Sequence, residues 1–148
     1  MKKLLAIFAL SLLLGLNALA ADNLKLNQSL DYSSDSLDGP LITSENSDAG
    51  AQAGKPNYVI IYGEGCFNSK RQARRTVELY QKYKDRVNFV VVDLDQKRSD
   101  AQQQLVKSYY RGYIPHVVVL DKTGDAVYNS SGEVPSEKIS ALLDKALQ

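Results

Sequence analysis

The segment YGEGCFNSK, residues 62–70, contains Cys66, the only cysteine in the 148-residue chain. Just before it, residues 58–62 form an apolar run of branched and aromatic side chains, which is typical of a strand buried on both faces. After it, apolar residues recur at helical spacing over residues 69–84 and predict an amphipathic helix. We therefore expect Cys66 at a turn where a buried strand leads into a helix.

A cysteine at the start of a helix lies near unpaired backbone amides and the positive end of the helix dipole, both of which favour the thiolate. A cation such as Lys70 near the sulfur would favour the thiolate further, whereas Glu64 would oppose it. The hydroxyl of Ser69 can donate a hydrogen bond to the sulfur. Cys66 and Ser69 are thus candidate catalytic residues, with Glu64 and Lys70 as candidate modulators. An inert cysteine is the alternative.

The rest of the chain continues as alternating strands and helices. The expected elements are a strand at 87–94, a helix at 99–110, strands at 117–120 and 126–128, and a last helix that opens at Pro135 with Ser136 as its cap. The order strand, helix, strand, helix, strand, strand, helix predicts an α/β domain with one mixed sheet and helices on both faces.

Residues 1–20 have the features of a secretory signal peptide: a basic start, a short apolar core and an A-x-A exit. We expect cleavage after Ala20, a periplasmic or secreted mature protein, and no membrane association after cleavage. An uncleaved N-terminal membrane anchor is the alternative, because the apolar run can be extended to Ala21.

Residues 21–54 carry six acidic residues against one lysine and are rich in Ser, Asp, Asn and Gly. A segment of this composition buries too little apolar surface to offset the entropy of ordering. The sequence therefore predicts a flexible acidic leader over residues 21–54, followed by a folded domain over residues 55–148.

Composition excludes several kinds of site. A chain with one cysteine has no intramolecular disulfide, so its stability must come from a packed core. One cysteine and one histidine are too few to close a metal site, and we expect neither a metal nor a cofactor. Without the signal peptide the chain has 16 basic and 17 acidic residues, and this near-neutral charge argues against a nucleic-acid partner.

Residues 61–70, IYGEGCFNSK, resemble the active-site segment of the thioredoxin superfamily, in which a strand ends in W-C-x-x-C-K and a helix follows. Residues 112–116, GYIPH, resemble the G-I-P-T loop of the same family. The resemblance covers about residues 55–148 and implies a thioredoxin fold, a central mixed four-stranded sheet flanked by helices. Within the superfamily, the chain is similar to exported or membrane-anchored thioredoxin-like proteins of bacteria and thylakoids.

The resemblance places Cys66 on the nucleophilic cysteine and Ser69 on the resolving cysteine, giving a monothiol CxxS site. It implies a cis peptide bond before Pro115, and a loop at Ile114 and Pro115 whose backbone binds an extended client segment. His116 follows this loop and would be a proton carrier and a third candidate modulator if it faced Cys66. A packed histidine is the alternative.

Because a serine cannot resolve a mixed disulfide, another thiol must do so. Our first hypothesis is monothiol thiol–disulfide exchange with a client protein that carries a cysteine or disulfide, or with a low-molecular-weight thiol. Its redox recycling partner is not identified by the sequence. The corresponding enzyme would be a thiol–disulfide oxidoreductase or isomerase without a resolving cysteine. The alternatives are a non-catalytic binding or adaptor module and a covalent homodimer through Cys66.

Overall fold

The computed structural model describes residues 19–148, so the predicted signal peptide, apart from its last two residues, lies outside the described part of the chain. The elements are β1 (Asp22–Leu26), β2 (Ile42–Glu45), β3 (Asn57–Tyr62), α1 (Phe67–Tyr83), β4 (Asn88–Asp93), α2 (Asp100–Tyr109), β5 (His116–Leu120), β6 (Ala126–Ser131) and α3 (Ser136–Ala146). Over this described range, none of the helices has the length and hydropathy needed to cross a membrane.

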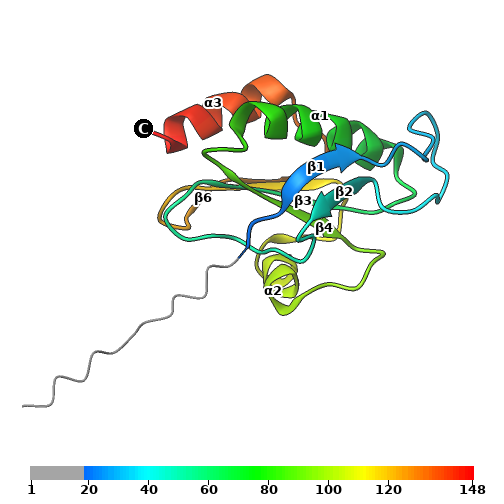
Figure 1. The fold of residues 1–148 in the computed structure, drawn as a ribbon, viewed down its shortest axis with the longest axis horizontal. Coiled ribbons are helices and arrows are strands. Elements are labelled where there is room, and N and C mark those ends of the chain that lie inside the picture. The colour runs from blue at the N-terminus through cyan, green and yellow to red at the C-terminus, as the bar shows by residue number, and fades with distance from the viewer. Residues whose placement is uncertain (1–18) are drawn as a thin grey trace, which may run out of the picture.

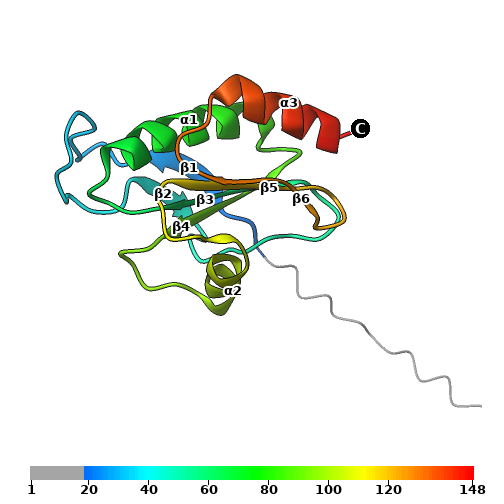
Figure 2. The same cartoon turned by 180° about the vertical axis from the view of Figure 1, so that it is seen from behind.

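Four strands form the central sheet, in the order β4-β3-β5-β6. Strand β3 pairs in parallel with β4 and antiparallel with β5, and β6 pairs antiparallel with β5. Helices α1 and α3 cover one face of this sheet and α2 covers the other (Figures 1 and 2). The predicted α/β architecture, a mixed four-stranded sheet flanked by helices, is confirmed.

Two cores form because β3 is buried on both faces, with every residue of the strand buried. Tyr58, Ile60 and Tyr62 point to the face that carries α1 and α3, while Val59 and Ile61 point to the α2 face. The expected element boundaries were close but not identical. Helix α1 begins at Phe67 rather than 69, and Ser136 is the first residue of α3, not its cap.

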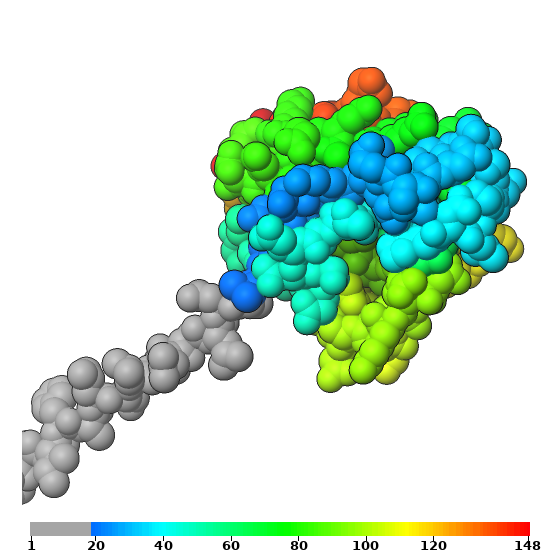
Figure 3. All heavy atoms as spheres, turned by 45° about the vertical axis from the view of Figure 1, so that its right-hand side comes forward, coloured from blue at the N-terminus to red at the C-terminus, as the bar shows by residue number. Residues whose placement is uncertain are grey.

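The leader is ordered, and the prediction of a flexible segment over residues 21–54 is wrong. Strands β1 and β2 form a separate antiparallel pair, and β1 contacts α1. Leu24 and Leu41 are fully buried and belong to the same core cluster as Ile60 and Tyr62. Figure 3 shows the leader, blue to cyan, lying over the green surface of α1.

A few contacts that the composition of the leader does not reveal hold it on the domain. Burying a leucine contributes roughly 1.5–3 kcal/mol, so two such residues offset part of the entropy lost when the leader is ordered. Polar contacts from the domain add to this. The Tyr80 hydroxyl donates to the Asp22 carboxylate, and the Tyr62 hydroxyl accepts from the Leu41 amide at 3.0 Å. These partners are far apart in sequence, so amino-acid composition alone does not reveal them.

Replacing Leu24 with alanine tests whether the leader is part of the fold. We expect Leu24→Ala to lower the free energy of unfolding by about 2–4 kcal/mol, because it opens a cavity in the core. Leu37→Ala is the matched control, since Leu37 is 75% exposed and lies in the same leader. Urea unfolding measures both variants. Equal, small effects would show that the leader does not pack on the domain.

Candidate functional site

The pairing of β3 with β5 brings the two sequence motifs together. Ile61 lies opposite His116 in the antiparallel register, so the chain leaving β3 runs beside the chain entering β5. Cys66 Sγ consequently lies 4.0 Å from the carbonyl oxygen of Ile114, a geometry in which the thiol can donate to this oxygen. The peptide bond between Ile114 and Pro115 is cis, as the resemblance implies.

Cys66 is the N-cap residue of α1, with an extended backbone at φ −101° and ψ 119°. The residue is half-buried and its thiol is free. Gly63, three residues earlier, allows a close approach, because a Cβ built there would lie 2.6 Å from the tip of Ile114. The absence of a side chain at Gly63 thus lets Ile114 lie close to the end of β3.

Ser69 lies in the first turn of α1 and is completely buried. Its hydroxyl has no hydrogen-bond partner among the described residues. The hydrogen bond that the Ser69 hydroxyl could donate to the sulfur is therefore absent. A buried hydroxyl without a partner costs roughly 1–3 kcal/mol, so this position would accept a less polar thiol at little cost.

Lys70, a candidate modulator of the thiol, is fully buried. Its ammonium donates to the backbone carbonyls of Asp31 and Ser36 and lies 3.5 Å from the Asp38 carboxylate. A buried charge must be paired in this way to be tolerated. The contacts of Lys70 are therefore with the leader segment 31–40, which we call the strap.

The strap also reaches the residues on either side of Cys66. The carboxylate of Asp35 accepts a hydrogen bond of 2.6 Å from the amide of Phe67, the first residue of α1. The side chain of Leu37 lies over Gly65, where a Cβ would come within 2.8 Å of it. Gly65 replaces the tryptophan expected from the resemblance, and the strap fills part of that space.

Glu64 and Asp93 form a pair of neighbouring carboxyl groups. The carboxylate of Glu64 accepts from the Gln96 amide at 2.6 Å, and the Glu64 backbone amide donates to Asp95 at 2.8 Å. Burial raises the pKa of the neighbouring Asp93 to about 6, and the charge of Glu64 adds to the rise. The side-chain contacts of Glu64 are thus with Gln96 and with Asp93, the last residue of β4.

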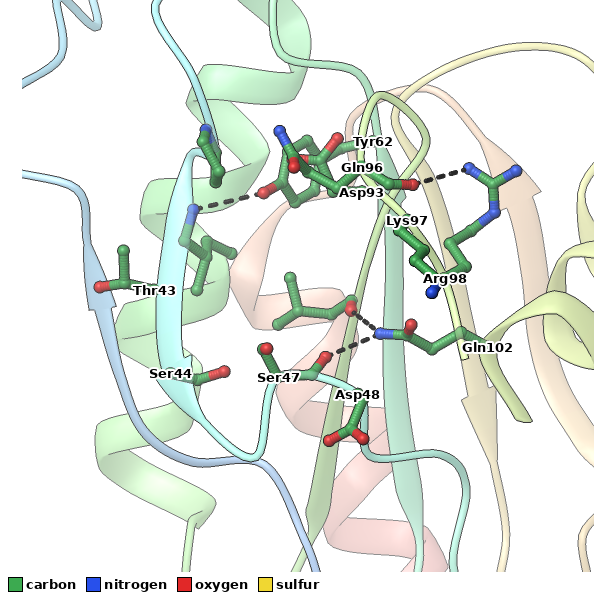
Figure 4. Close-up of a pocket in the computed structure, with 13 residues that line it drawn as sticks. Thr43, Ser44, Ser47, Asp48, Tyr62, Asp93, Gln96, Lys97, Arg98 and Gln102 are labelled. Atoms are coloured by element: carbon green, nitrogen blue, oxygen red, sulfur yellow. Dashed lines mark hydrogen bonds between the residues drawn. The ribbon is translucent and has the colours of Figure 1, made fainter. Parts of the chain in front are cut away.

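A cavity of about 370 Å³ lies between β2 and the end of β4 (Figure 4). Tyr62 and Asp93 line it on the domain side, and Ser44 and Ser47 on the leader side. Gln102 bridges the two sides, because its amide donates to the carbonyls of Ser47 and Val91. Cys66 does not line this cavity, so the thiol and the cavity are separate features.

His116 is buried, and both of its ring nitrogens are engaged by β6. Nδ1 lies 2.8 Å from the Ser131 hydroxyl and Nε2 lies 2.6 Å from the Asn129 side-chain oxygen. Its ring also packs edge-on against Tyr110. These contacts make His116 a packed histidine, and none of them links it to Cys66.

The site therefore combines Cys66, Ile114 and Pro115, as the motifs predicted, with a leader strap that they did not predict. Of the candidate modulators, Lys70 contacts the strap, Glu64 contacts Gln96, and His116 contacts β6. The only sequence signal for the strap was the opposite charge of the acidic leader and the basic start of α1.

The chain belongs to the thioredoxin-like domain family, whose family model matches residues 46–147. The match begins inside the predicted leader, nine residues before the boundary expected at residue 55. The coverage agrees with the structure, in which the second half of the leader packs against the domain.

Curated relatives include plant and cyanobacterial proteins. The chloroplastic thioredoxin-like protein HCF164 of rice is 32% identical over 110 residues, which cover 74% of this chain and 41% of that protein. The thiol:disulfide interchange protein TxlA homolog of Synechocystis is 33% identical over 94 residues, covering 61% and 51%. The chain therefore spans about half the length, or less, of these relatives.

Solved structures support the fold alone. An uncharacterised thioredoxin-like protein from Clostridium perfringens has a TM-score of 0.54 at 19% identity, covering 65% of this chain and 74% of that one. Thioredoxin-2 of a malaria parasite has a TM-score of 0.52 at 19% identity, covering 62% and 82%.

The raised pKa of Asp93 gives a pH-dependent contribution to stability. Because the folded state holds the Asp93 proton up to about pH 6 and the unfolded state only to about 3.8, the contribution is present at low pH and lost as the pH rises through 6. We expect wild type to lose stability relative to Asp93→Asn between pH 4 and 7, measured by urea unfolding.

Asp85→Asn, at an exposed position, is the matched control for Asp93→Asn. The stability difference between wild type and this control should change far less with pH. If the stability difference between wild type and Asp93→Asn is equally independent of pH, protonation of Asp93 is not coupled to folding.

Proposed function

We propose that the protein performs monothiol thiol–disulfide exchange, with Cys66 as the nucleophile. The observation that carries the proposal is the position of the half-buried Cys66 thiol, at the N-cap of α1 and 4.0 Å from the Ile114 carbonyl oxygen. The names of the TxlA relatives, thiol:disulfide interchange proteins, support the same chemistry at the level of the family.

The first step forms a mixed disulfide. The Cys66 thiolate attacks one sulfur of a client disulfide, a new bond joins the two sulfurs, and the second client sulfur leaves as a thiolate. The helix N-terminus stabilises the attacking thiolate. The loop before β5 is exposed at Arg111, Gly112 and Tyr113 and partly buried at Ile114, whose backbone would bind an extended client segment beside the sulfur.

Release of Cys66 needs a second thiol from outside the site, because Ser69 carries a hydroxyl. If a client thiol attacks the mixed disulfide, Cys66 leaves as a thiolate and the client disulfide is rearranged without net oxidation. If a low-molecular-weight thiol attacks the client sulfur, a new mixed disulfide forms between that thiol and the client. The protein thus fits isomerisation or transfer better than rapid reduction.

Export is part of the proposal. The signal-peptide features of residues 1–20 support a periplasmic or secreted mature protein. We expect the mass of the protein recovered from its native host to correspond to a chain that begins at Ala21. A mass that includes residues 1–20 would favour the membrane anchor instead.

Replacing Ser69 with cysteine tests whether the missing resolving thiol limits turnover. We expect Ser69→Cys to reduce a disulfide-bonded protein such as insulin catalytically, with a small dithiol as the electron donor, and wild type to show little turnover above background. The completely buried, unpartnered Ser69 hydroxyl leaves a site that a thiol can fill. The measurement is the rate of insulin reduction.

Ser69→Ala is the control, because it removes the hydroxyl without adding a thiol and should show no gain in turnover. The double variant Cys66→Ser with Ser69→Cys should be inactive, since the nucleophile is missing. No gain in Ser69→Cys, together with no mixed disulfide at Cys66 in wild type, would favour the non-catalytic binding module.

A further inference from the structure

The strap contacts the chain on both sides of the reactive sulfur. Asp35 holds the amide of Phe67, which follows Cys66, and Leu37 lies over Gly65, which precedes it. Leu37 is 75% exposed, although it is an apolar residue in contact with the domain. The leader therefore forms one wall of the site and presents an apolar side chain to anything that approaches the thiol.

Lys70 fixes this wall from inside the protein. Its side chain is completely buried, and its ammonium donates to the Ser36 carbonyl at 3.1 Å and to the Ser36 hydroxyl at 3.2 Å. Two further acceptors, the Asp31 carbonyl and the Asp38 carboxylate, complete the pairing. Because removing these partners would leave a buried charge unpaired, the Lys70 contacts hold the strap in this position.

Asp35 is the acidic group that caps the first turn of α1. This turn contains no acidic residue of its own, and Cys66 makes no side-chain capping hydrogen bond. A carboxylate at a helix N-terminus uses the same amides and the same dipole that would stabilise a thiolate there. Two negative charges in this place would also repel each other.

The other charged groups around the cysteine are engaged elsewhere. Lys70 is paired with the strap, Glu64 accepts from Gln96, and Arg71 is paired with Glu133. The Asp95 carboxylate accepts from the backbone amide of Glu64. From the loop before β5, the contact to the sulfur is the neutral carbonyl of Ile114. Among these charged groups, Asp35 is thus the one that accepts a hydrogen bond from the first residue of α1.

We propose that the strap restrains Cys66, with Asp35 occupying the helix N-terminus in competition with the thiolate and Leu37 covering the adjacent Gly65. The inference rests on the proposed exchange function, which it deepens by naming the element that regulates the same site. A client segment that displaces Leu37 and Asp35 frees the amide of Phe67 and gives the thiolate full use of the helix N-terminus. The thiol is then most reactive when a client protein is bound.

Neutralising Asp35 tests the competition. We expect Asp35→Asn to shift the pH profile of Cys66 alkylation by iodoacetamide to lower pH, with a rate near pH 7 that rises about two- to fivefold, the size typical of one charge at a helix terminus. Asparagine keeps an acceptor for Phe67, so the turn is preserved. Asp48→Asn is the matched control, because it makes the same charge change in the leader outside the strap.

Leu37→Ala tests whether the Leu37 side chain hinders access to Cys66, by comparing the reaction rates of two reagents. We expect it to accelerate reaction with a disulfide-bonded protein more than reaction with iodoacetamide, because only the larger reagent needs the space over Gly65. Profiles of Asp35→Asn that coincide with wild type and Asp48→Asn would overturn the competition. An equal effect of Leu37→Ala on both reagents would overturn the covering role.

The proposed exchange function is tested separately, by mass measurement of mixed disulfides in wild type and Asp35→Asn. If neither protein forms one while their alkylation profiles differ, the exchange function fails and the restraint on the thiol stands. If both form mixed disulfides with identical alkylation profiles, the function stands and the restraint fails.

Discussion

The antiparallel pairing of β3 with β5 is the constraint on which the site depends. Because Ile61 lies opposite His116, the residues that leave β3 and those that enter β5 meet at one edge of the sheet. Cys66 and Ile114 are 48 positions apart in sequence, yet the sulfur and the carbonyl oxygen lie 4.0 Å apart. The burial of both faces of β3 makes this register costly to change, since a shift by one residue would exchange its two cores.

A second constraint is the buried charge of Lys70. Its ammonium needs acceptors, and the leader supplies them, which links a segment of unpromising composition to the start of α1. The hydrophobic residues Leu24 and Leu41 hold the leader on the domain, and the Lys70 contacts set where the strap lies. The same contacts place Asp35 and Leu37 beside Cys66, so the element that completes the fold also limits access to the thiol.

The fold and the position of Cys66 could be predicted because they follow from local patterns: an apolar strand, a helix period and two short motifs. The leader could not, because Leu24 and Leu41 gain their stability from partners on β3 and α1, far away in sequence. The partners of Lys70 and His116 could not be predicted for the same reason. Each side chain is defined by contacts across the fold, with the strap for Lys70 and with Ser131 and Asn129 for His116.

Capture of a client by Cys66 tests directly whether the protein performs monothiol exchange. Wild-type protein is incubated at pH 7 with two copies of a one-cysteine peptide joined by a disulfide, and the intact mass is measured before and after addition of a small thiol. We expect one peptide per chain, attached at Cys66, that persists until the thiol is added and is absent in Cys66→Ser. A chain whose mass does not change, although Cys66 is alkylated normally, would contradict monothiol exchange.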